Sequence, residues 1–321
     1  MKHNYSWPNG AKFAFSVFDD TDNATIENCK PVYDYLIKKG VLTTKSVWVY
    51  APRGGYSGGF LKDNSYLEWI KDLKSNGVEI GLHNIGDGAF ITSEIEEGLE
   101  TFNKLIGYYP KVHANHAANP DNLYSWEKRF VFPVNLAYKL YRYFYFLKRK
   151  KWINLSNGEN LNSSHFWGNI AKDKIKYVRN YTFTDINTLK LDNKMPWHDR
   201  SKPFVNYWFS SSDGSNLKGF NNLLSSKNLD QLENEGGACI VYTHFASGFV
   251  DKYGNLDPVF KQRIDDLASR KGWFVPTGVL LDFILSQRKL SVKNEISYMY
   301  KLEKSLFWAF ERIKRYLGLG I

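Results

Sequence analysis

The sequence predicts an α/β protein folded as a distorted (β/α) barrel. Short runs of β-branched and aromatic residues recur along the chain, and each is followed by a polar loop and a segment with apolar residues at helical spacing. Strands that alternate with helices are typical of a parallel sheet. Because the alternation continues to about residue 288 of 321, we expect the sheet to close into a barrel.

The elements can be placed in order. Strands are expected over 12–18, 46–50, 78–82, 111–115, 176–184, 204–209, 238–243 and 273–276, and helices over 24–40, 64–76, 91–107, 257–270 and 277–288. The stretch 153–235 is rich in Asn, Ser and Gly and less regular. We therefore expect one barrel domain over residues 1–290, with its elements least defined in that stretch.

Two segments depart from the alternation. An insertion at about 128–152 contains eight Lys and Arg, no acidic residue and many aromatic residues. Residues 291–321 place apolar side chains at steps of three or four beside a basic flank, which predicts a C-terminal amphipathic helix. Both segments could contact an anionic membrane through their rings and basic groups, or could pack on the barrel as ordinary surface elements.

Composition limits the class of protein and the cellular compartment to be considered. With 43% hydrophobic and 17% aromatic residues, the chain can bury a core and is not disordered. Cys29 and Cys239 are too few and too far apart for a disulfide scaffold or a CxxC site. The N-terminal residues lack a signal-peptide pattern, and no apolar run is long enough to span a bilayer. We expect a cytoplasmic protein, with peripheral contact at the inner face of the membrane as the alternative. The net charge of +10 comes with no recognised nucleic-acid motif, which argues against a nucleic-acid partner.

Polar side chains of a particular kind follow the predicted strands. In a parallel barrel the loops at the carboxyl ends of the strands converge on one mouth, so reactive groups are sought there. Carboxylates and imidazoles from separate strand ends are the ligand set expected for Zn²⁺ in a site that keeps a position for water. The residues at these positions are Asp19, Asp20, Asp22, Arg53, His83, Asp87, His116, Asn119, Asp121 and His244.

Three motifs among these residues carry a family resemblance. Phe18-Asp19-Asp20, the run Glu79 to His83, and the run Val241 to His244 resemble, in order and spacing, motifs of the polysaccharide deacetylases, the family 4 carbohydrate esterases. The resemblance implies that Asp19 is the general base and His244 the general acid. It also implies that Asp20 and His83 bind the metal.

The chain departs from that family at two places. Asp87 stands where a second histidine is usual, and the run His113 to Asn122 replaces an Arg-Pro motif. The third metal ligand is therefore either His116 or Asp87, and His116 is favoured because an imidazole on a neighbouring strand end can face the ion directly. The replaced run is similar to divergent deacetylase-like proteins associated with bacterial surface-polysaccharide synthesis.

The resulting hypothesis is a metal-dependent hydrolase, with zinc as the favoured divalent ion, that removes the acetyl group from an acetamido sugar in a bacterial surface glycan or its lipid-linked precursor. Arg53, Asn119 and Asp121 are expected to bind the saccharide. The alternative is a catalytically silent barrel that binds a glycan or a membrane surface, which the two departures would permit.

Overall fold

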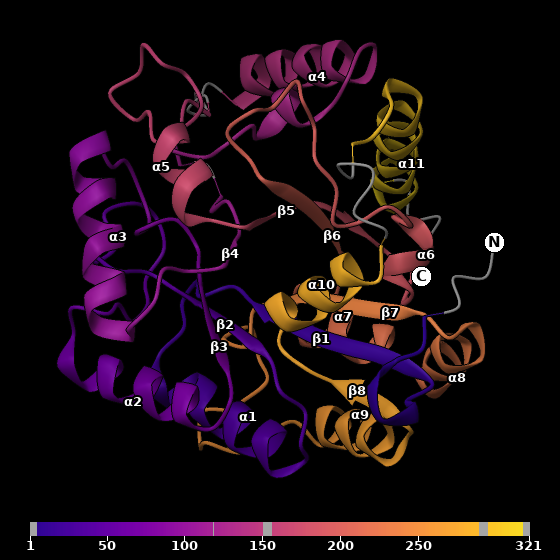
Figure 1. Cartoon of the computed structure of the whole chain (residues 1–321). Helices are drawn as coiled ribbons and strands as arrows, with labels where there is room; N and C mark the ends of the chain where they lie inside the picture. The colour runs from indigo at the N-terminus through magenta and orange to yellow at the C-terminus, as the bar shows by residue number, and fades with distance from the viewer. Residues whose placement is uncertain (1–4, 118, 150–155, 289–294, 317–321) are drawn as a thin grey trace.

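The structure, a computed structural model, describes residues 5–117, 119–149, 156–288 and 295–316. Its strands form one parallel sheet in the order β2-β3-β4-β5-β6-β7-β1-β8, and β1 also pairs with β2, which closes a barrel (Figure 1). The predicted fold class is therefore confirmed. The strands are β1 (Phe13–Asp19), β2 (Thr44–Val47), β3 (Glu79–Leu82), β4 (Val112–His113), β5 (Tyr177–Phe183), β6 (Tyr207–Asp213), β7 (Ala238–Thr243) and β8 (Gly272–Phe274).

The closure of the barrel is uneven. One edge of β1 pairs with β7 over most of its length. On the other edge, its first residues pair with β8, whereas Phe18 and Asp19 at its end pair with β2. The barrel is thus closed at the carboxyl end of β1, where a buried ion pair joins Asp19 to Lys45 of β2 at 2.8 Å.

Helices surround the sheet (Figure 1). All residues of β1 are buried, because this strand has helices on its outer side and the barrel core on its inner side. Local sequence sets several helix starts, for example at Thr25 and Asp63, whose side chains accept hydrogen bonds from the first turn. The surrounding helices are α1 (Ile26–Lys38), α2 (Asn64–Ser75), α3 (Thr92–Ile106), α5 (Gly168–Lys174), α6 (Thr188–Leu191), α7 (Leu217–Leu223), α8 (Ser226–Glu235), α9 (Pro258–Ser269) and α10 (Thr277–Ser286).

Two further helices, α4 (Val134–Arg149) and α11 (Tyr298–Tyr316), lie against each other at the outside of this ring (Figure 1). A short 3-10 helix, η2 (Trp126–Arg129), leads into α4. Residues 150–152 of the predicted insertion, and 291–294 and 317–321 of the predicted tail, lie outside the described residues. The division of the chain at residue 290 stays a prediction.

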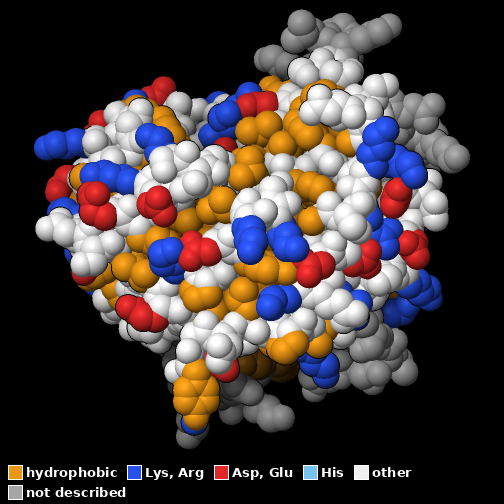
Figure 2. All heavy atoms as spheres, turned by 90° about the horizontal axis from the view of Figure 1, so that it is seen from below, with side chains coloured by type: hydrophobic (Ala, Val, Ile, Leu, Met, Phe, Trp, Pro, Cys, Tyr) orange, Lys and Arg blue, Asp and Glu red, His pale blue; other side chains and the backbone are white. Residues whose placement is uncertain are grey.

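Apolar and charged side chains are mixed on the face seen from below in Figure 2. Apolar side chains occupy much of its centre, with basic and acidic groups scattered among them. The excess positive charge of the chain is therefore not gathered on this face. Among the described residues, no helix is long and apolar enough to cross a membrane.

Candidate metal centre and its cavity

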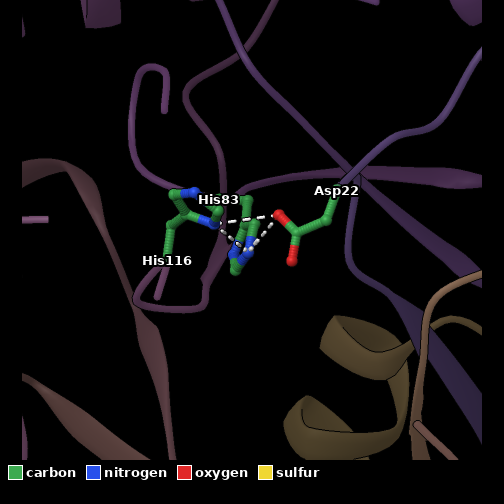
Figure 3. Close-up of side chains that lie close together, drawn as sticks. All are labelled: Asp22, His83 and His116. Carbon is green, nitrogen blue, oxygen red and sulfur yellow. Dashed lines mark hydrogen bonds and ion pairs between the residues drawn. The ribbon is translucent and has the colours of Figure 1, made fainter. Parts of the chain in front are cut away.

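Three side chains from different loops meet at the carboxyl ends of the strands. Asp22 follows β1, His83 directly follows β3, and His116 lies just beyond β4. The Oδ1 atom of Asp22 is 2.9 Å from Nδ1 of His116 and 3.4 Å from Nε2 of His83. The two ring nitrogens are 3.0 Å apart (Figure 3). All three residues are buried, with at most 9% of their surface exposed.

The far side of each ring decides which nitrogen carries the proton. Nδ1 of His83 lies 3.0 Å from the carbonyl of Ala114, and Nε2 of His116 lies 2.9 Å from Oδ1 of Asp87. These oxygens can only accept, so both outer nitrogens donate and both inner nitrogens present a lone pair. The Oδ1 atom of Asp22 is also buried and accepts no hydrogen bond. Three electron-pair donors therefore face one point, an arrangement that a cation stabilises.

The donor set fits a divalent metal. Spacings of about 3 Å are what ligand pairs span around a zinc ion held at about 2.0–2.1 Å. Two imidazoles and a carboxylate suit zinc and related ions and leave a further position open. Each histidine is also oriented from behind by an oxygen acceptor, as metal-binding histidines usually are.

A proton competes with a cation for this position. Burial lowers the pKa of His116, but the nearby carboxylates of Asp22 and Asp87 outweigh burial and raise it. Protonation would place a hydrogen on Nδ1, the atom that faces the other donors. The site should therefore bind cations more weakly as the pH falls.

A cavity of about 260 Å³ opens beside this cluster. Asp20 lines it, and both oxygens of its carboxylate are held by Arg179 of β5, at 2.9 and 2.5 Å. Burial opposes ionisation of Asp20, but Arg179 and the neighbouring His83 lower its pKa. Asp20 is therefore ionised at neutral pH. The cavity is lined by Asp20, Asp22, Asn23, Tyr56, His83, Asn115, Ala117, Arg179, Tyr242, His244 and Ser247.

His244 reaches the same cavity from the end of β7. Its Nδ1 lies 2.8 Å from the carbonyl of Ser215, and its Nε2 lies 2.9 Å from Oδ2 of Asp22. Burial lowers the pKa of this imidazole, but the hydrogen bond to Asp22 and the charge of Asp20 raise it to about 9. His244 can therefore hold a proton at neutral pH and donate it into the cavity.

Asp19 lies behind the cavity rather than in it. Its Oδ2 accepts hydrogen bonds from Tyr33 and Lys45, and its Oδ1 accepts one from the backbone N–H of Phe245. The side chain is fully buried. Asp19 is not among the residues that line the cavity, and its three hydrogen bonds tie the end of β1 to α1, β2 and the loop after β7.

Strand β1 ends at Asp19, and the N–H of Asp20, the next residue, still donates to the carbonyl of Thr243 in β7. A turn follows, with Asn23 at a positive φ of 57°. This turn brings Asp22 across to the histidines, while the Oδ2 atom of Asp20 stays 3.7 Å from Nε2 of His83. Asp22 is thus the carboxylate that lies with the two histidines in the structure.

The structure does not place the predicted saccharide-binding residues among those that line the cavity. Arg53 lies at the surface, where it pairs with Glu94 at 2.7 Å. Asn119 bonds to the backbone of the loop after β3, at Gly86 and Gly88, and Asp121 is buried against Asn84. Their role in binding a saccharide stays a prediction.

Asp87, the alternative third ligand, lies on the outer side of His116 and not with the three converging donors. Its Oδ1 bonds to that ring and its Oδ2 accepts the backbone N–H of Tyr56. Asp87 therefore orients a donor of the cluster from behind.

Sequence reasoning missed Arg179, Tyr56 and Tyr242 as cavity residues. Arg179 had a usable signal, because a charged side chain inside a predicted buried strand needs a partner of opposite charge. Tyr56 had none beyond its position in a glycine-rich loop. Tyr242 belongs to an apolar strand and is recognised only from the barrel geometry.

Comparison with known proteins gives a fold but no close relative. No protein-family model matches the chain, and no curated protein matches it in sequence. Among solved structures, a protein described as a polysaccharide deacetylase from Pseudomonas aeruginosa PAO1 is similar with a TM-score of 0.50. The match has 11% identity and covers 88% of this chain and 94% of that one.

Two further solved structures are similar over most of their length. A protein described as a polysaccharide deacetylase from Mycobacterium smegmatis has 13% identity and a TM-score of 0.49, with 90% and 96% of the two chains covered. A family 4 acetyl xylan esterase from Clostridium thermocellum, solved with cobalt, has 13% identity and a TM-score of 0.39, with 86% and 91% covered. The match with a TM-score of 0.50 shows that the protein has the fold of the polysaccharide deacetylases, as the three sequence motifs predicted.

Proposed function

We propose that this protein is a metal-dependent hydrolase that removes the acetyl group from an N-acetylated sugar. One observation carries the proposal: a cavity beside three converging metal donors is lined by the carboxylate of Asp20, whose pKa is lowered, and the imidazole of His244, whose pKa is raised. These are the groups that metal-assisted hydrolysis of an amide requires. The deacetylase fold supports the same class.

The proposed metal ligands are Nε2 of His83, Nδ1 of His116 and Oδ1 of Asp22, and zinc is the proposed ion. When bound there, such an ion would lower the pKa of a water molecule and polarise the acetamide carbonyl. Asp87 and the carbonyl of Ala114 hold the two imidazoles in the orientation that this requires.

We assign the role of general base to Asp20 rather than to Asp19, because Asp20 lines the cavity and Asp19 does not. Arg179 holds its carboxylate ionised and in a fixed orientation. Asp20 would take a proton from the attacking water as the new C–O bond forms. His244 would give its Nε2 proton to the amide nitrogen as the C–N bond breaks, so acetate and an amine leave.

The lining of the cavity suits a sugar. Asn23, Asn115 and Ser247 offer hydrogen-bonding groups, and the ring of Tyr56 lies at its edge, 5.0 Å from the ring of His116. We propose that the substrate is part of a bacterial surface glycan or its lipid-linked precursor. In that proposal Arg53, which is exposed at the surface, would contact an anionic group outside the cavity.

The test measures metal content and acetate release together. The metal-loaded protein is expected to release acetate from N-acetylglucosamine oligomers, and a chelator to abolish release. Asp20→Asn should retain the metal and lower kcat by at least about a hundredfold. Asp19→Asn is the neighbouring control and should keep most activity in the fraction that remains folded.

The reverse result, with activity lost only in Asp19→Asn, would contradict the assignment of the base. Saccharide binding without acetate release by metal-loaded protein would instead favour the glycan-binding barrel.

A further inference from the structure

Helix α4 turns its apolar row away from the protein. Leu136, Leu140, Tyr143, Phe144 and Leu147 recur at helical spacing and therefore share one side. Each is between 49% and 64% exposed. A surface helix of a globular protein normally turns such a row toward the core. The orientation of α4 is therefore unusual and calls for an apolar partner.

The inner side of α4 is already packed, so the outward row is not simply a helix that has failed to dock. Tyr138 contacts the rings of Phe130 and Trp308, with centroids 5.1 and 6.0 Å apart. Arg142 forms an ion pair with Glu127 of η2 at 2.8 Å. One side of the helix is thus packed against the protein, and a second, apolar side is exposed.

Helix α11 repeats this arrangement beside α4. Tyr300 and Trp308 are buried on its inner side, and the hydroxyl of Tyr300 donates to buried Asp192 at 2.6 Å. Its outward apolar residues are Met299, Leu306, Phe310 and Ile313, each between 51% and 67% exposed. The hydroxyl of Tyr298 also donates to the carbonyl of Phe132 ahead of α4, which links the two helices. Two neighbouring helices therefore present apolar rows to the outside.

Charge identifies the kind of partner. Residues 128–151 contain eight basic residues and no acid. Of these, Lys128 and Arg142 pair with acids outside the segment, Glu159 and Glu127. Lys139 of α4 and Arg312 and Lys314 of α11 are exposed beside the apolar rows. A second copy of the chain would bring two such basic segments together, which is unfavourable. An anionic lipid surface offers both negative charge and an apolar layer beneath it.

We propose that α4 and α11 form a docking surface for an anionic lipid bilayer. In this arrangement the apolar rows enter the boundary between headgroups and acyl chains, and the basic side chains lie at the phosphate level. The proposal is independent of catalysis, because none of these residues lines the cavity.

The test is sedimentation of the full chain with vesicles. One set contains phosphatidylcholine alone and the other about one third phosphatidylglycerol. Binding is expected only to the anionic vesicles and should weaken with salt. The double variant Leu140→Glu/Phe144→Glu should bind at least about tenfold more weakly, and Lys139→Gln about fivefold more weakly.

A matched control places the same substitutions elsewhere. Tyr253 and Val259 are also exposed, at 77% and 42%, but lie by the start of α9, across the molecule from α4 (Figure 1). Tyr253→Glu/Val259→Glu should bind vesicles like the wild type. Circular dichroism of every variant is measured to check that it is folded.

Three results would overturn the proposal. The first is no binding to anionic vesicles, and the second is equal weakening by both double variants. The third is a concentration-dependent dimer that Leu140→Glu/Phe144→Glu abolishes, because it would assign the surface to a second copy of the chain.

Discussion

The orientation of His116 depends on one carboxylate. Asp87 accepts hydrogen bonds from the ring of His116 and from the backbone N–H of Tyr56, so the same side chain serves the metal donor and the glycine-rich loop. We expect Asp87→Asn to lower zinc affinity by about 10–100-fold, because the amide group would set a donor against one of these two N–H groups. Competition with a chromogenic chelator measures the change. An unchanged affinity would show that Asp87 does not support the site.

Two adjacent glycines provide a sharper form of this test. A Cβ atom at Gly54 would lie 2.5 Å from Oδ1 of Asp87, whereas one at Gly55 would meet nothing within 4 Å. Gly54→Ala should therefore displace Asp87 and weaken zinc binding, and Gly55→Ala should leave it unchanged. Equal zinc affinity in the two variants would mean that the loop does not act on the site through Asp87.

Buried Asp121 gives stability a pH dependence of known sign. Burial raises the pKa of this carboxyl from 3.8 to about 7, against the hydrogen bond from Asn84. A carboxyl with a raised pKa favours the folded state at low pH, and this contribution is lost as the pH rises from about 4 through about 7. Between about pH 4 and about pH 7, the free energy of unfolding of Asp121→Asn should therefore rise relative to that of the wild type by up to roughly 4 kcal/mol. Urea unfolding of both proteins at several pH values measures the difference, and a constant difference would contradict the prediction.

At the residue scale, the sequence pattern places the histidines more directly than the carboxylates. His83, His116 and His244 follow apolar strands directly, so the strand pattern alone places them at the mouth of the barrel. Asp19, Asp20 and Asp22 lie within one turn, and their separate roles depend on where the chain leaves the strand. That point depends on backbone pairing with β7 at Thr243, which a local pattern does not contain.

Among the elements, the contact between β1 and β2 combines backbone pairing with a buried charge pair. Asp19 and Lys45 are both fully buried and bonded at 2.8 Å. Lys45→Met should lower the free energy of unfolding by about 3–5 kcal/mol, because it leaves the Asp19 carboxylate buried and without its counter-charge. Lys45→Met/Asp19→Asn should recover part of that loss in urea unfolding. A double variant less stable than the single one would contradict this explanation.

The elements that the sequence predicted are those with a clear apolar period. The helix expected at 64–76 is α2, and the strand expected at 238–243 is β7. By contrast, β6 extends through three serines to Asp213, beyond the expected 204–209. The hydroxyl of Ser210 donates a hydrogen bond to buried Asp192, which follows α6 and is 18 residues away in the sequence. Polar residues with distant partners give no strand signal, and for this reason the stretch 153–235 was the least defined.

For the whole molecule, the metal is expected to contribute to folding stability. A ligand that binds only the folded state at about 100 times its Kd adds about 2.7 kcal/mol. Zinc should therefore raise the Tm by about 5 °C, and a chelator should reverse the change. His83→Ala should remove the response to zinc. A zinc-dependent shift that persists in this variant would locate the stabilising ion elsewhere.

The overall barrel could be predicted because alternating strands and helices have few parallel arrangements. The packing of α4 against α11 could not be predicted, because it depends on contacts between residues that are distant in sequence, such as Tyr138 and Trp308. Periodicity identified both helices as amphipathic, but it does not say which way each apolar row turns.

The pairing of β1 also has a consequence for how the chain is made. This strand precedes the other strands of the sheet in the chain, yet one edge pairs with β7, more than 200 residues later, and its other edge pairs partly with β8. Until those segments leave the ribosome, the mostly apolar residues Phe13 to Phe18 lack the partners that these two strands provide. Such segments favour association between nascent chains. The first strand is therefore among the last to be completed, and production of the protein should depend on chaperones that shield it in the interval.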